Sequence, residues 1–237
     1  MTNPQTTTPA KTAPATKLNL DFSRPVFINS HLESWQKSPM SGVWRKRLAR
    51  EEAERGHATS IVKYEAGASF SPHPHPLGEE IFVLDGVFSD ETGDYPAGSY
   101  LRNPEGFEHA PFSKEGCIIF VKLHQFQPED RKQVRVDTRN TEWLPGLGNL
   151  KVMPLHEFSN HEMSESTALV FWPAGEQFQP HTHFGGEEIL VISGEFIDEH
   201  NRYPAGSWLR SPHLSKHTPY VEQDTVILVK VGHLPIA

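Results

Sequence analysis

The chain has 237 residues, a formal net charge of −8 and a single cysteine, Cys117. Such an acidic chain lacks the clustered lysines and arginines of a nucleic-acid-binding surface, and one cysteine excludes an internal disulfide or a cysteine-based zinc cluster. No apolar run approaches the about 20 residues of a transmembrane helix, and the N-terminus lacks the apolar core of a signal peptide. We therefore expect a cytoplasmic protein that binds neither nucleic acid nor a membrane.

The N-terminal part of the chain contains a polar tail and a few short apolar patches. Residues 1–16 are mostly Thr, Pro and Ala, which predicts a disordered tail because almost nothing there can be buried. The patches at 25–28 and 60–64 are typical of strands. Between them, residues 44–55 mix Arg with Glu, and we interpret this stretch as a solvated strand pair or loop.

From Gly67 onward the pattern is that of a β protein. Short runs rich in Val, Ile, Phe and Tyr alternate with Gly and Pro turns, and no segment has the length and period of a sizeable helix. Two similar runs, 117–123 and 225–231, carry apolar side chains on one face and Lys122 and Lys230 on the other. Polar residues 124–145 predict the connection between two units.

The dominant feature is an internal repeat. The stretch 67–86, GASFSPHPHPLGEEIFVLDG, recurs at 175–194 as GEQFQPHTHFGGEEILVISG. The offset is 108 residues, and the register holds without a gap from 65–123 onto 173–231. Such a repeat is typical of a duplicated structural unit. We predict two domains, residues 17–127 and 128–237, which follow the tail at 1–16.

Each copy contains two histidines, a glutamate and a third histidine at the same offsets. They are His73, His75, Glu79 and His109 in the first unit, and His181, His183, Glu187 and His217 in the second. Histidines two residues apart on a strand project from the same face. Imidazoles and a carboxylate suit zinc, iron, manganese or nickel, whereas calcium takes oxygen ligands. We predict one divalent transition metal per unit, with zinc or iron preferred; the alternative is polar residues that line a barrel and satisfy one another by hydrogen bonds.

A second carboxylate follows each predicted ligand glutamate, at Glu80 and Glu188, and on a regular strand it faces the opposite side. Arg102 and Arg210 also recur in register. We interpret these four residues as two structural ion pairs. The alternative is that the arginines orient a ligand carboxylate or bind an anionic substrate.

The two units differ in charge beside the third ligand. Glu105 and Glu108 in the first unit correspond to His213 and Lys216 in the second, so we expect pockets of different charge. Cys117 is interpreted as a core residue. The remaining histidines have no repeated partner and are expected at the surface: His31, His57, His124, His156, His161, His200, His213 and His233.

The spacing Gly67-x5-His73-x-His75-x3-Glu79-x6-Gly86 matches the first cupin motif, and 175–194 matches it again. Of the second motif, Pro-x-Gly-x2-His-x3-Asn, the segments 96–98 and 204–206 fit, but the histidine comes 11 residues after the glycine. This delayed histidine resembles the ChrR-like cupin family. The resemblance implies an all-β fold of two tandem cupin barrels (double-stranded β-helices, or jelly rolls), a bicupin, and it implies that the eight predicted ligands bind metal.

Relatives of this cupin type include acetylacetone-cleaving-type dioxygenases, which act on β-diketones or hydroxyacetophenones with ferrous iron held by three histidines. The resemblance thus implies a metal-dependent oxidoreductase acting on a diketone or hydroxyketone, with His73, His75 and His109 holding iron. The alternative is a non-enzymatic sensor related to the ChrR anti-sigma factor, whose cupin holds zinc with three His and one Glu. We expect a small-molecule ligand or substrate, and a homodimer is a further expectation because cupins often pair through edge strands.

Overall fold

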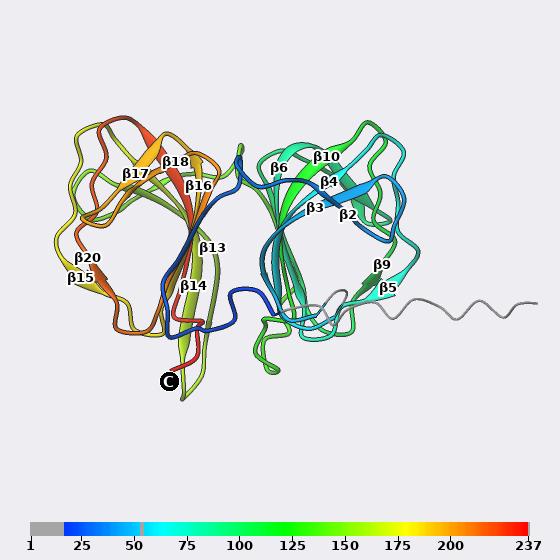
Figure 1. The fold of residues 1–237 in the computed structure, drawn as a ribbon, viewed down its shortest axis with the longest axis horizontal. Helices are drawn as coiled ribbons and strands as arrows, with labels where there is room; N and C mark the ends of the chain where they lie inside the picture. Colours follow the sequence, from blue (N-terminus) through cyan, green and yellow to red (C-terminus); the bar gives the residue numbers. More distant parts are fainter. Residues whose placement is uncertain (1–16, 53–54, 237) are drawn as a thin grey trace, which may run out of the picture.

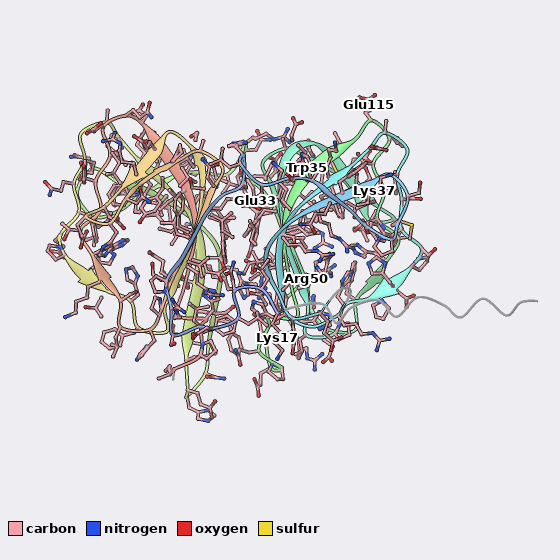
Figure 2. The ribbon with its side chains drawn as sticks, in the orientation of Figure 1. Lys17, Glu33, Trp35, Lys37, Arg50 and Glu115 are labelled. Atoms are coloured by element: carbon pink, nitrogen blue, oxygen red, sulfur yellow. The ribbon has the colours of Figure 1, made fainter. Side chains whose placement is uncertain are left out.

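The computed structural model describes residues 17–52 and 55–236, and within them the fold is all β. Two barrels stand side by side, one built mainly from each half of the chain (Figure 1). Side chains fill the barrels and the space between them (Figure 2). None of these residues forms a helix that is long and apolar enough to cross a membrane. The expected bicupin architecture is confirmed, while the expected tail at 1–16 lies outside the described residues.

Each barrel is built on one large antiparallel sheet. The first runs in the order β11 (Val134–Asp137), β8 (Ser99–Asn103), β6 (Glu79–Asp90), β10 (Cys117–Leu123), β4 (Ala58–Tyr64), β3 (Val43–Arg50) and β2 (Gln36–Lys37), with β7 (Gly93–Pro96) paired to β6. The second runs in the order β1 (Val26–Asn29), β19 (Ser207–Ser211), β16 (Glu187–Ser193), β21 (Thr225–Val231), β14 (Ser164–Trp172), β13 (Lys151–Ser159) and β12 (Leu144–Pro145). Two-stranded pairs complete the barrels: β5 (His73–Pro74) with β9 (Glu108–His109), β15 (His181–Thr182) with β20 (Lys216–His217), and β17 (Glu195–Ile197) with β18 (Arg202–Pro204).

The glycine that ends each copy of the repeated motif allows two strands to approach closely. Gly86 has φ 70°, and a Cβ there would lie 2.2 Å from the Gly116 carbonyl oxygen. Gly194 has φ 77°, and its Cβ would lie 2.4 Å from the Asp224 carbonyl oxygen. Both positions therefore require glycine, because an L side chain meets backbone that cannot move aside.

The two barrels exchange one strand each. Strand β1 lies early in the chain but pairs with β19 of the second barrel, where Val26 is opposite Arg210. Strand β11 lies after the first repeat but pairs with β8 of the first barrel, where Val134 is opposite Arg102. Both residues of one pair are offset by 108 from the other pair, so the exchange follows the repeat. Each predicted domain therefore completes the sheet of its neighbour, as the N-terminal segment in Figure 1 illustrates.

One apolar cluster crosses from barrel to barrel. It joins Leu48, Phe82 and Phe120 of the first barrel to Leu169 and Trp208 of the second, and all five are buried. Two further clusters fill the interiors of the individual barrels. Burial between the sheets adds to burial within them, at about 25 cal/mol per Å² of apolar surface.

The stretch 44–55, expected to be solvated, contributes mainly to strand β3, whose burial contradicts that expectation. Leu48 and Ala49 are fully buried, Lys46 is 8% exposed and Arg50 is 6% exposed. Leu48 and Ala49 belong to the cluster between the barrels, so the face that looked solvated is covered by tertiary packing. Composition alone could not reveal this, because the covering surface comes from a distant part of the chain.

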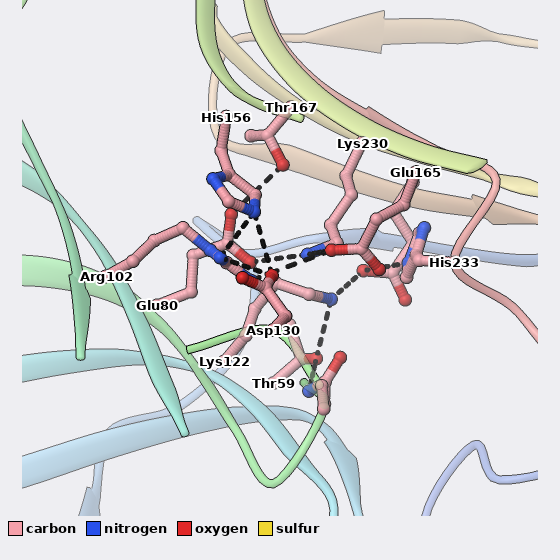
Figure 3. Close-up of polar contacts among 12 residues, drawn as sticks. Thr59, Glu80, Arg102, Lys122, Asp130, His156, Glu165, Thr167, Lys230 and His233 are labelled. Atoms are coloured by element: carbon pink, nitrogen blue, oxygen red, sulfur yellow. Dashed lines mark hydrogen bonds and ion pairs between the residues drawn. The ribbon is translucent and has the colours of Figure 1, made fainter. Parts of the chain in front are cut away.

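Two buried ion pairs connect the barrels. Glu80 lies directly opposite Lys122 on the neighbouring strand, yet its carboxylate pairs with Lys230 of the second barrel at 2.8 Å (Figure 3). Reciprocally, Lys122 pairs with Glu188 of the second barrel. All four side chains are almost fully buried. Each charge therefore depends on a partner from the other barrel, since an unpaired buried charge costs several kcal/mol.

The expected pairs of Arg102 with Glu80 and of Arg210 with Glu188 are wrong. The Arg102 guanidinium lies 2.7 Å from the Asp130 carboxylate. Arg210 donates instead to two backbone carbonyls of the N-terminal segment, at 2.6 and 3.1 Å. The lysines of the opposite barrel take the glutamates, which a reading of each repeat in isolation could not show.

Two histidines expected at the surface are buried. His156 is 3% exposed, and the side chain of His233 is 2% exposed and lies 3.8 Å from the Glu188 carboxylate. Cys117 is buried, as expected of a core residue.

Replacing Lys230 with Met should lower the free energy of unfolding by about 3–5 kcal/mol, because Glu80 would stay buried without its partner. The double variant Glu80→Gln, Lys230→Met should recover much of this loss. Chemical denaturation of wild type, both single variants and the double variant gives the interaction energy. Additive losses would contradict a coupled pair.

The same pairs predict a loss of stability in acid. Burial raises the pKa of Glu80, but Lys230, Arg102 and hydrogen bonds outweigh it and hold that pKa below its ordinary value of 4.5. A depressed pKa contributes stability that is present above pH 4.5 and is lost as the pH falls toward the folded value. Melting temperatures measured between pH 6 and pH 3 should therefore fall less steeply for Glu80→Gln than for wild type; equal slopes would refute this.

Candidate metal centres

Short strand pairs bring the predicted ligands of each unit together. In β5 and β9, His73 is opposite His109, and in β15 and β20, His181 is opposite His217. The glutamates are the first residues of β6 and β16. A tight turn joins the second histidine to the glutamate in each unit, closed by a backbone hydrogen bond to the carbonyl of His75 or His183.

The second site gathers all four predicted residues. Ligand atoms of His181, His183, Glu187 and His217 lie within 4.8 Å of one another. His183 Nε2, Glu187 Oε2 and His217 Nε2 are buried and have no hydrogen-bond partner. Buried polar atoms without partners are costly, and a cation among them would satisfy all three. The donor set therefore fits a divalent metal.

The first site has the same composition but tighter internal contacts. His73, His75 and His109 offer nitrogens within 4.8 Å of one another. Glu79 joins them, because its Oε2 lies 3.3 Å from His109 Nε2 and 3.6 Å from His75 Nε2. Asn103 donates to the same Glu79 oxygen at 2.9 Å. This set also fits a metal, although its members satisfy one another.

The two glutamates differ in electrostatics. Burial raises the pKa of Glu79, but His75, His109 and Asn103 outweigh it and lower that pKa to about 2. Burial likewise raises the pKa of Glu187, and the weaker attraction of His217 leaves it at about 7. Position 211, the counterpart of Asn103, is serine. The protein alone thus compensates the first carboxylate and leaves the second without compensation.

The histidines show matching differences. Burial lowers the pKa of His109, but hydrogen bonds to Asp90 and Glu79 outweigh it and raise that pKa to about 9. Burial, with the neighbouring His217 and His181, lowers the pKa of His183 to about 3.

Other groups orient the ligating rings. His73 Nδ1 lies 2.8 Å from the Ser71 carbonyl oxygen, and His181 Nδ1 lies 3.1 Å from that of Gln179. An Nδ1–H that donates to a carbonyl leaves Nε2 as the free donor atom for a metal.

Two aspartates perform the same role for the third ligand, and the sequence analysis missed them. Asp90 lies 3.1 Å from His109 Nδ1, and Asp198 lies 3.3 Å from His217 Nδ1. They stand 108 residues apart, so the register of the repeat was the signal that could have found them. Tyr203 donates to Asp198 at 3.1 Å and holds it in place.

The second site opens into a cavity of about 520 Å³, lined by His183 and His217 together with Phe27, Tyr203, Ser215 and Lys216. Phe27 belongs to the exchanged strand β1. Its ring packs edge-on against Tyr203, with centroids 5.0 Å apart. The first unit therefore supplies part of the wall of the second site.

The counterparts of Phe27 and Ser215 cover the first site. Arg135, on the exchanged strand β11, donates to Asn103 Oδ1 at 2.6 Å and to the Tyr95 hydroxyl at 3.2 Å. Its guanidinium lies 5.5 Å from the ring centre of Phe107, and that ring lies 5.5 Å from the His109 ring. The equivalent space thus holds two large side chains instead of an aromatic ring and a serine.

The predicted difference in charge is visible at these mouths. Lys216 lines the second cavity, whereas its counterpart Glu108 is exposed beside the first site. Glu105 pairs with Arg131 at 3.0 Å.

A third cluster of Asp130, His156 and Glu165 has metal-like spacing, within 4.8 Å. It already surrounds a cation, since Arg102 lies 2.7 Å from Asp130 and 2.6 Å from His156 (Figure 3). Lys230 lies 3.2 Å from Glu165. We interpret this cluster as part of the ionic contact between the barrels.

A family model described as "ChrR Cupin-like domain" matches residues 23–127 and again 131–235. No curated protein matched the chain. A putative dioxygenase from Nostoc punctiforme aligns with a TM-score of 0.74 and 14% identity, covering 88% of this chain and 82% of that one. A bacterial pirin from Escherichia coli in complex with nickel(II) aligns with a TM-score of 0.66 and 11% identity, covering 90% and 100%. An oxalate decarboxylase variant from Bacillus subtilis gives 0.59 and 14%, covering 86% and 76%. At these identities the likeness concerns the fold.

Removing metal should lower the melting temperature, because a ligand bound only by the native state at a hundredfold excess over its Kd stabilises by about 2.7 kcal/mol. Calorimetry before and after chelation measures this. The double variant His75→Ala, His183→Ala is the control and should not respond. An unchanged melting temperature after elemental analysis shows complete stripping would contradict the prediction.

Asp198→Asn should weaken metal binding at the second site by about 10–100-fold, because His217 loses the carboxylate that orients it. Competition with a chromogenic chelator measures the affinity. The exposed Asp137→Asn is the matched control and should leave it unchanged. Equal affinities for Asp198→Asn and wild type would refute the orienting role.

Proposed function

The chain belongs to the ChrR cupin-like family, and from this premise and the two sites we propose that it is a metal-dependent oxidoreductase that reacts its substrate at the second site. The observation that carries the proposal is the set of three unpartnered ligand atoms beneath a cavity of about 520 Å³. Cavities of about 300–1,000 Å³ suit small organic molecules.

The cavity walls favour a small anionic substrate with an apolar part. Phe27 and Tyr203 supply flat apolar surface, and Lys216 supplies a positive charge. Ser215 Oγ is buried without a hydrogen-bond partner, so it is free to bind a substrate oxygen. An enolisable diketone or hydroxyketone has these properties, because its enolate is anionic and compact.

A bound divalent metal would supply Lewis acidity and, in the case of iron, redox capacity for dioxygen. His181, His183, Glu187 and His217 would hold it. Asp198 fixes the His217 ring, so the ligands stay oriented while substrate enters. The walls orient the substrate over the ligand set and exclude water, and orientation alone can lower a barrier by about 7–11 kcal/mol. The similarity in fold to the Nostoc dioxygenase is consistent with this class of reaction.

For the first site we propose a structural or sensing role. Arg135 and Phe107 occupy the space through which a substrate would approach, and Glu79 is already compensated by its neighbours. This is the non-enzymatic metal role that the ChrR-like resemblance implies, confined to one unit. Of the cellular compartments, we propose the cytoplasm.

Iron-loaded protein should consume oxygen with a 1,3-diketone, and His183→Ala should reduce the rate to background because it removes a ligand of the second site. His75→Ala, its counterpart in the first unit, should retain most of the activity. An oxygen electrode measures both, with elemental analysis of each variant. Greater loss in His75→Ala than in His183→Ala would contradict the assignment.

Phe27→Arg should reproduce in the second site the cover that Arg135 gives the first. We expect kcat/KM to fall at least about tenfold, since a lost fit of ~1.4 kcal/mol suffices for that factor, while metal content stays unchanged. Phe27→Leu keeps an apolar wall and should remain active. Full activity of Phe27→Arg would show that substrate does not pass this strand.

A further inference from the structure

A second cavity, of about 440 Å³, lies between the two barrels. None of the eight predicted metal ligands lines it. Trp35 forms part of its wall, on the segment that leads from β1 into the first barrel, and Figure 2 labels this residue near the junction of the barrels. Cavities at domain junctions are a common location for small-molecule sites.

Most of the wall is apolar and comes equally from both units. Leu84 and Ile118 of the first barrel face the cavity with their counterparts Ile192 and Val226 of the second. All four are only partly buried, although they pack against the cluster between the barrels. Apolar surface that folding leaves open in this way gains free energy when a ligand covers it, at about 25 cal/mol per Å².

One buried ammonium lies in this apolar wall. Lys46 is 8% exposed, and its Nζ donates to the Ser30 carbonyl oxygen at 2.7 Å. The same Nζ lies 4.5 Å from the ring centre of Trp35. An ammonium has three donors, so two remain after the bond to Ser30.

No carboxylate forms an ion pair with Lys46 in residues 17–52 or 55–236. Glu33 acts on it only through its field, and burial is the main cause that lowers the pKa of Lys46. An anion in the cavity would therefore complete the coordination of a desolvated cation.

The repeat duplicates the apolar wall but not the ammonium. The counterpart of Lys46 in register is Pro154, and the counterpart of Ser30 is Thr138. A site with one charged end and a symmetric apolar wall fits one ligand in one orientation.

We propose that the cavity between the barrels binds one molecule of an amphipathic carboxylate, with its carboxylate on Lys46 and its hydrocarbon part against Leu84, Ile118, Ile192 and Val226. Charge complementarity selects the carboxylate over a neutral or cationic amphiphile. The apolar wall selects a hydrocarbon chain over a small polar acid. The site is independent of the metal centres and of the reaction proposed for them.

The test is calorimetric titration of the full chain with decanoate and with decanol, in both the metal-loaded and the chelator-treated protein. We expect one equivalent of decanoate per chain, bound at least about tenfold more tightly than decanol, because charge-assisted hydrogen bonds contribute about 1.5–3 kcal/mol. Lys46→Met should abolish this preference. Lys63→Met, which removes the other ammonium near Trp35, at 5.3 Å from its ring, is the matched control and should retain it.

Leu84→Trp, which fills the cavity without touching the charge, should abolish binding of both ligands, and circular dichroism and melting curves verify that each variant folds. Equal affinity for decanoate and decanol, or a preference that survives Lys46→Met, would overturn the proposal. Binding that disappears on chelation would place the carboxylate at a metal centre instead. Absence of binding, with self-association that Leu84→Trp abolishes in sedimentation, would assign the cavity to a second copy of the chain.

Discussion

The contact between the barrels is the constraint on which the rest of the structure depends. Glu80 and Lys122 face each other on neighbouring strands, but each is neutralised by a residue of the opposite barrel. Buried charges tolerate little displacement from their partners, because separation restores the cost of desolvation. The pairs therefore hold the barrels in one relative position, and the apolar cluster around them supplies the area that stabilises it.

That position makes the exchange of strands productive. Strand β1 extends over the second barrel and delivers Phe27 to the wall of its cavity, and β11 delivers Arg135 to the first site. Each metal centre thus combines ligands from its own repeat with a covering residue from the other half of the chain. Duplicated ligand sets acquire different environments because the exchanged strands carry different side chains.

The differences are concentrated at a few positions of the repeat. Asn103 satisfies the first glutamate, and serine stands at its counterpart, position 211. Phe107 contacts the His109 ring, and its counterpart Ser215 lines an open cavity. These substitutions exchange internal satisfaction for access. A site with spare donor atoms and space above them suits chemistry, whereas a satisfied and covered site suits structure or sensing.

The sequence by itself determined the all-β class, the two barrels and the grouping of the ligands, because these depend on local spacing. Histidines two residues apart share a strand face, and a gapless 108-residue register repeats whatever the first unit forms. The same register contained Asp90 and Asp198, which a fuller reading would have found. Only the tertiary structure decided the partners of Glu80 and Glu188, the burial of β3 and the cover of each site. These depend on which surfaces meet, and the meeting surfaces lie up to 150 residues apart in the chain.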